Sequence, residues 1–162
     1  MCGRSPTINR EQKKALLTIY EGFGRKFAAN LASILRADVD ANLTHIGLLA
    51  YREFVCGLPN PTFMNLLYAK TLPGSLIFNL NPSVLYPMLD QILGEREPTL
   101  MAHRSLLEIE QQLAIRITNI FLQELKNVWK NIVNLEFEVI QTKNNPFVTN
   151  DAAQRSRRRY RF

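Results

Sequence analysis

The stretch from Leu72 to Gly94, which reads Leu-Pro-Gly-Ser-Leu-Ile-Phe-Asn-Leu-Asn-Pro-Ser-Val-Leu-Tyr-Pro-Met-Leu-Asp-Gln-Ile-Leu-Gly, decides the fold. Its Pro-Gly pair signals a turn, and the apolar run at about 75–80 predicts a strand that leaves this turn. Asn81 is a good helix N-cap and Pro82 suits the first helical position, while Gly94 suits the position just past a helix end. The stretch therefore predicts a turn, a strand and a well-capped helix in direct succession.

Towards the N-terminus, apolar spacing and turn residues predict further elements. Gly22 and Gly24 fall inside the first of them, a helix, and each weakens it by about 1 kcal/mol relative to alanine. Cys56 lies in an apolar context and is expected to be a buried, inert thiol. The predicted elements are an amphipathic helix at 8–37, a short strand at 39–43, a short helix at 46–57 and a strand at 62–69.

Towards the C-terminus, two patterns predict a long helix and a strand. Ser105-Leu-Leu-Glu108 has the form of a capping box, so a helix is expected to begin there and to run to about Lys130. Residues 133–139 alternate strictly between apolar and polar, which predicts a strand with one polar face. Long helices beside short, hairpin-compatible strands predict an α+β fold with helices packed on a sheet.

Composition and charge narrow the class of protein. The chain has 162 residues, 46% of them hydrophobic, and two cysteines, which suits a globular protein of a reducing compartment. No apolar run approaches the roughly 18 residues of a membrane span. The net charge is +6, but five of the 20 basic residues are arginines in residues 151–162. A short basic tail binds polyanions weakly and without specificity, so we expect no specific nucleic acid partner.

The residues that catalysis requires are sparse. Neither His45 nor His103 has a neighbouring ligand at metal-binding spacing, and no phosphate-binding loop or nucleophile motif is present. Glu108 and Glu110 stand two apart on a helix, so they do not face each other, and Glu108 is explained as a cap. The sequence therefore predicts a protein that is not an enzyme and uses no metal or cofactor.

The sequence contains an ordered series of short motifs. They are Leu58-Pro59-Asn60-Pro61-Thr62, Leu72-Pro73-Gly74-Ser75, Leu80-Asn81-Pro82-Ser83, Asp90-Gln-Ile-Leu-Gly94, Leu106-Leu-Glu108-Ile109-Glu110-Gln111, Val128-Trp129 and Thr142-Lys-Asn-Asn145-Pro146. In this order the motifs resemble those of the flagellar motor switch protein FliM family over most of residues 8–147.

The resemblance implies the first half of a CheC-like, pseudo-symmetric α/β/α sandwich that is preceded by a long amphipathic helix. The expected division is an N-terminal helix at 1–38, this half of the middle domain at 39–150, and a disordered basic tail at 151–162. Regions that correspond to the family's CheY-binding peptide and FliN-binding domain are not found in the sequence. We therefore expect a truncated form of the protein.

The resemblance also implies a function in the C-ring, the switch complex of the flagellar basal body, where the chemotaxis signal sets the direction of rotation. The expected location is cytoplasmic and peripheral to the inner membrane, and the expected partners are FliG and neighbouring FliM copies. The family's Gly-Gly-x-Gly loop, which contacts FliG, aligns with residues 94–97, where only the first glycine is present. We therefore expect weakened FliG binding. The candidate contacts are Asp90, Gly94, Glu95, Arg96 and Glu97.

The alternative function is that of a CheC-like phosphatase of phosphorylated CheY. Enzymes of that family place three residues on one helix face. These are an acid or serine, a glutamate four residues later, and an asparagine three residues after the glutamate. Glu124 and Asn127 have this separation, but position 120 is isoleucine. We interpret the pair as surface decoration, because two polar residues three apart arise readily on a solvated helix face.

Overall fold

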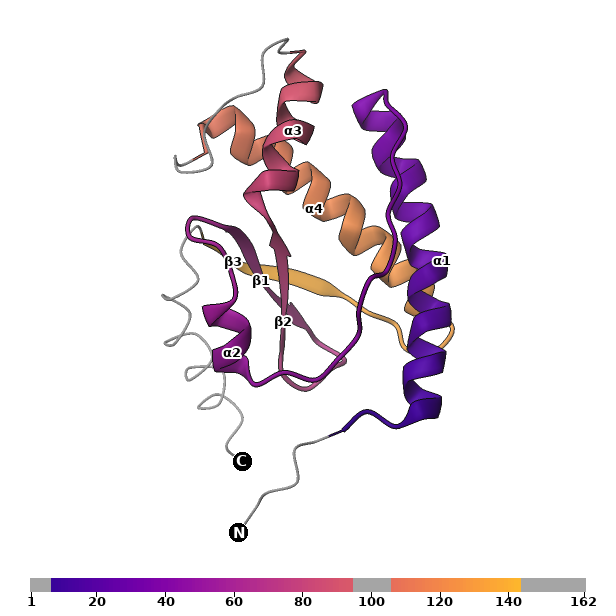
Figure 1. Cartoon of the computed structure of the whole chain (residues 1–162). Helices are drawn as coiled ribbons and strands as arrows, with labels where there is room; N and C mark the ends of the chain where they lie inside the picture. The colour runs from indigo at the N-terminus through magenta and orange to yellow at the C-terminus, as the bar shows by residue number, and fades with distance from the viewer. Residues whose placement is uncertain (1–6, 95–105, 144–162) are drawn as a thin grey trace.

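The computed structural model describes residues 7–94 and 106–143, which form four helices and a three-stranded sheet (Figure 1). The mixture confirms the α+β class. In chain order the elements are α1 (Arg10–Leu35), α2 (Tyr51–Cys56), β1 (Phe63–Ala69), β2 (Ser75–Leu80), α3 (Pro82–Leu93), α4 (Glu108–Trp129) and β3 (Phe137–Lys143).

The sheet is antiparallel throughout, with the strand order β2-β1-β3. The hairpin β1–β2 pairs Phe63 with Leu80 and Tyr68 with Ser75. On its other side β1 pairs with β3, from Ala69 opposite Phe137 to Met64 opposite Lys143, with a register shift on the way. As the central strand, β1 is buried along nearly its whole length, whereas β3 is exposed over most of its residues.

The core lies where α1, α3 and α4 gather against the sheet, while the short α2 is set apart from these helices (Figure 1). The aromatic ring of Phe121 on α4 stacks on Phe78 of β2 at a centroid distance of 4.0 Å and meets Phe23 of α1 edge to face. The aliphatic part of the core includes Leu31, Leu35, Leu67, Leu80, Leu85, Leu89, Ala114 and Ile117. The expected division of the chain near residue 38 stays a prediction.

One chain of polar side chains crosses this core from the sheet to α4. Asn65 of β1 is only 1% exposed. Its side-chain oxygen accepts a hydrogen bond from the Thr142 hydroxyl (2.8 Å), and its amide donates to the Thr118 hydroxyl (3.3 Å). Thr118 in turn donates to the backbone carbonyl of Ala114 at 2.9 Å. Since unpaired polar groups are costly inside a protein, this chain fixes β1, β3 and α4 relative to one another.

Both ends of α3 are capped as predicted. The side-chain oxygen of Asn81 accepts a hydrogen bond from the backbone N–H of Ser83 at 3.0 Å, and Pro82 takes the first helical position. Gly94 ends the helix at φ 72°, a left-handed conformation that glycine adopts without steric cost.

The predicted start of α4 is wrong. The helix begins at Glu108, its N-cap is Leu107, and Ser105 lies outside the described residues. The carboxylate that reaches back is that of Glu110, which accepts a hydrogen bond from the backbone N–H of Leu107 at 2.7 Å. Glu108 is therefore not the capping residue.

Four other predictions need correction. Residues 39–43 form no strand, and α2 begins at Tyr51, five residues later than expected. The last strand begins at Phe137 instead of 133, because pairing with β1 starts only where Ala69 lies opposite Phe137. Cys56 is an exposed free thiol and not a core residue.

Across the described residues, each helix is too short or too polar to cross a membrane.

Candidate functional site

The end of α3 holds the first two residues that the sequence singles out. Gly94 is exposed, and its backbone N–H donates to the carbonyl of Asp90 one turn earlier. The Asp90 side chain is itself buried, at 9% exposure. Glu95, Arg96 and Glu97 lie outside the described residues. The structure thus brings Asp90 and Gly94 within one helical turn, with the glycine exposed and the aspartate buried.

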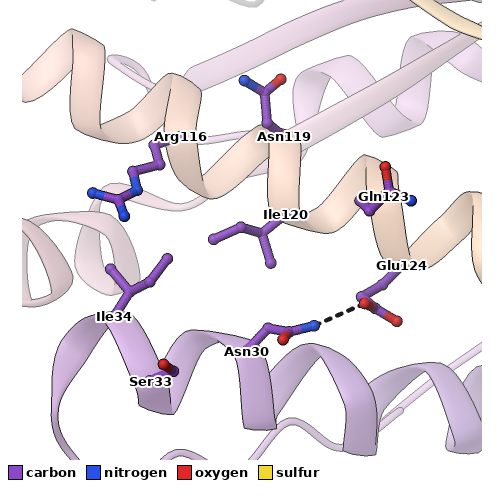
Figure 2. Close-up of a pocket in the computed structure, with 8 residues that line it drawn as sticks. All are labelled: Asn30, Ser33, Ile34, Arg116, Asn119, Ile120, Gln123 and Glu124. Carbon is purple, nitrogen blue, oxygen red and sulfur yellow. Dashed lines mark hydrogen bonds between the residues drawn. The ribbon is translucent and has the colours of Figure 1, made fainter.

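A second candidate site is a groove of about 480 Å³ between α1 and α4, shown in Figure 2. Asn30, Ser33 and Ile34 line it from α1, and α4 adds residues at spacings of three and four, which place them on one helix face. The lining residues of α4 are Arg116, Asn119, Ile120, Gln123 and Glu124.

The charged groups lie at opposite ends of this groove. Figure 2 shows Arg116 at one end and Glu124 at the other, with Ile120 between them and Ile34 across the groove from Arg116. Arg116 is exposed, and its guanidinium makes no hydrogen bond or ion pair with another described residue. The groove therefore has a cationic end, an apolar middle and an anionic end.

The interpretation of Glu124 as a solvent-exposed residue is wrong, because only 7% of this residue is exposed. One of its carboxylate oxygens accepts a hydrogen bond from the side-chain amide of Asn30 at 2.7 Å and a longer one from Asn127 at 3.4 Å. The other oxygen has no hydrogen-bond partner within the described residues. Since no buried side-chain oxygen of the described residues lacks a partner, this second oxygen is reached by solvent.

The sequence contains a signal for the burial of Glu124. Glu124 stands seven residues after Ile117 and three after Phe121, so helical periodicity places it on the apolar side of α4. The identity of its partner Asn30, on another helix, has no signal in the local sequence.

The described residues offer little for metal-dependent chemistry. They contain no cluster of three or more histidine, cysteine, aspartate or glutamate side chains that suits a metal ion. The groove between α1 and α4 is lined mainly by amides, two single charges and two isoleucines.

Comparisons with known proteins identify similar sequences and structures. The family model "Flagellar motor switch protein FliM" matches residues 9–156. The FliM protein of Salmonella typhimurium is 32% identical over 138 residues, which cover 84% of this chain and 41% of that protein. The chain thus spans less than half the length of this relative.

Two solved structures from H. pylori are similar to the model. A chain of the FliG–FliM complex has a TM-score of 0.82 at 27% identity, covering 88% of this chain and 79% of that chain. The FliM middle domain has a TM-score of 0.75 at 28% identity, covering 85% and 74% of the two chains. These two similarities confirm the fold that the sequence resemblance implied.

Proposed function

This chain belongs to the FliM family of flagellar motor switch proteins, and we propose that it acts in the C-ring, the switch complex of the flagellar motor. The match to the family model over residues 9–156 carries the proposal. In that complex the protein would pass the chemotaxis signal to the direction of flagellar rotation. This function requires contact surfaces and no chemical step.

The proposed partners are FliG and neighbouring FliM copies. A chain similar to this one occurs in the solved FliG–FliM complex from H. pylori. We place the FliG contact at the exposed end of α3, with Asp90 and Gly94 followed by Glu95, Arg96 and Glu97. Two glutamates add bulk and negative charge where glycines allow a close backbone approach, so binding would be weak and sensitive to salt.

We also infer that the protein acts without catalysis, in the cytoplasm at the basal body. A CheC-like phosphatase would need Glu124 and Asn127 to hold a water molecule. Here the Asn127 amide donates to Glu124, and the Asn30 amide occupies the same carboxylate oxygen. Ile120 stands where such an enzyme has an acid or serine. These contacts favour a structural role for the pair.

A titration of the cognate FliG middle domain tests the proposal. The wild type should bind weakly, and the Glu95→Gly/Glu97→Gly double variant should bind more tightly. Glu136→Gln/Glu138→Gln is the charge-matched control, because it removes two exposed acids at β3 and should leave the affinity unchanged. Tight wild-type binding that the double variant weakens would make the two acids specific contacts. Absence of binding by every variant would remove FliG as the partner.

A further inference from the structure

We propose that Leu107 and Ile109, at the start of α4, form with Leu93, at the end of α3, an apolar contact surface for the FliG middle domain. The inference rests on the proposed FliG contact at the end of α3, and it adds a part of that surface which lies on a second helix. It follows from three exposed apolar side chains, one of which stands where a polar residue would stabilise the helix.

Leu107 stands at a position that leucine suits poorly. It is the N-cap of α4, and its side chain makes no capping hydrogen bond. Serine, threonine, asparagine and aspartate are preferred there, because their side-chain oxygen accepts a hydrogen bond from a free backbone N–H of the first turn. Burial does not compensate for the missing cap, since 59% of Leu107 is exposed. Contact with an apolar partner would give leucine an advantage that the folded chain alone does not.

Two further apolar side chains are exposed near Leu107. Ile109, two residues along α4, is 56% exposed, and Leu93, the last residue of α3, is 37% exposed. Their neighbours Ile92 and Leu106 are half-buried against the common core, and the end of α3 and the start of α4 lie at the same end of the molecule (Figure 1). Isolated apolar residues are normal on a protein surface, whereas neighbouring ones mark interaction sites.

The position of this surface selects its occupant. Gly94, the exposed residue next to Leu93, belongs to the FliG contact that we propose, so the apolar side chains continue that contact onto α4. A similar chain from H. pylori occurs in a FliG–FliM complex. The centre of a protein interface is more apolar and poorer in charge than its rim. The apolar surface would therefore supply the affinity that the charged residues after Gly94 do not, and salt should not screen this contribution.

The variant Leu107→Ser is the main test, because it should change stability and binding in opposite directions. Serine can cap α4, so the variant should unfold at a higher urea concentration than the wild type. It also removes an apolar side chain from the contact, so the dissociation constant for the FliG middle domain should rise about tenfold. A variant that binds less because it is misfolded cannot give this combination. Leu107→Ala provides neither the cap nor the leucine side chain, and it should weaken binding without the gain in stability.

The variant Ile109→Gln tests the second residue of α4 in the same titration of the full chain. Glutamine favours the helix at least as much as isoleucine does, so the fold should be kept. The dissociation constant should again rise about tenfold. Because the lost contact is apolar, the loss of affinity should be equal at low and at high salt.

The variant Ile132→Ser is the matched control. This isoleucine is 65% exposed, and it follows the opposite end of α4 from Leu107. Its substitution removes a comparable exposed apolar side chain and should leave the affinity for the FliG middle domain unchanged. Circular dichroism of each variant verifies that it is folded.

The outcomes separate this inference from the function on which it rests. Wild-type binding that the substitutions of Leu107 and Ile109 leave unchanged would overturn the apolar surface and keep FliG as the partner. Equal weakening by Ile132→Ser would also overturn it, because the effect would not be confined to this surface. Absence of wild-type binding would remove both the surface and the partner.

Discussion

The carboxylate of Glu124 on α4 accepts a hydrogen bond from the side-chain amide of Asn30 on α1 at 2.7 Å, across 94 residues of sequence. The acceptor is largely buried, whereas Asn30 is exposed. This bond joins the two longest helices on the side of the groove, in addition to the aromatic contacts that join them over the sheet. It also holds Glu124 in the orientation that the groove presents.

The first prediction concerns this bond. Asn30→Ala should lower the free energy of unfolding by about 1–3 kcal/mol, because the buried carboxylate loses its shorter hydrogen bond. Urea denaturation followed by circular dichroism measures the change. Asn119→Ala removes an exposed amide from the same groove and should change stability by less than about 0.5 kcal/mol. Equal effects of the two substitutions would show that the Asn30–Glu124 bond contributes little.

The second prediction separates two glycines of α1. A Cβ at Gly22 would meet no atom within 4 Å, so Gly22→Ala should stabilise the protein by up to about 1 kcal/mol through helix propensity. A Cβ at Gly24 would come to 2.5 Å from the backbone oxygen of Ala41, in the coil that runs back beside α1 (Figure 1). Gly24→Ala should therefore destabilise by about 1–3 kcal/mol. Thermal and urea unfolding of both variants provide the comparison, and a gain in stability from Gly24→Ala would contradict this packing.

The third prediction concerns the polar chain through the core. Asn65→Leu should destabilise by about 2–4 kcal/mol, since it leaves the hydroxyls of Thr118 and Thr142 without their buried partner. Adding Thr118→Val and Thr142→Val should recover part of this loss, because removing all members of a polar group together is far less costly than removing one. Urea denaturation of the single and triple variants tests the coupling. Losses that simply add would mean that the three side chains act independently.

The fourth prediction concerns catalysis. The protein should not accelerate the loss of phosphate from phosphorylated CheY, because Glu124 and Asn127 are engaged with each other and with Asn30. A phosphate-release assay with CheY alone as the reference measures this rate. Faster decay that Glu124→Gln or Asn127→Ala abolishes would establish the phosphatase function instead.

Local chemistry explains which parts of the fold are predictable. The roles of Asn81, Pro82 and Gly94 are predicted correctly because each acts on the helix end beside it. The strand at 62–69 and its partner at 75–80 are also predictable, since a short turn joins them. These signals depend only on near neighbours in the sequence.

The errors occur where a distant segment decides the outcome. The alternation at 133–139 is genuine, but β3 begins at Phe137 because β1 is available for pairing only as far as Ala69. The sequence indicates Glu108 as the capping carboxylate, but Glu110 takes this role because the helix begins at Glu108. Helical periodicity along α4 signals the burial of Glu124, but its partner Asn30 on α1 has no signal in the local sequence.

The position of β1 between its two neighbours also has a consequence for the order of folding. Its pairing with β2 closes a short loop, whereas its pairing with β3 joins segments on either side of α3 and α4. The entropy of loop closure favours the hairpin first, and the second pairing must wait for β3. As the chain leaves the ribosome, one edge of the most buried strand thus stays open until nearly all of the described chain has been synthesised. During that interval a chaperone or another nascent chain has access to an apolar strand that the finished protein conceals.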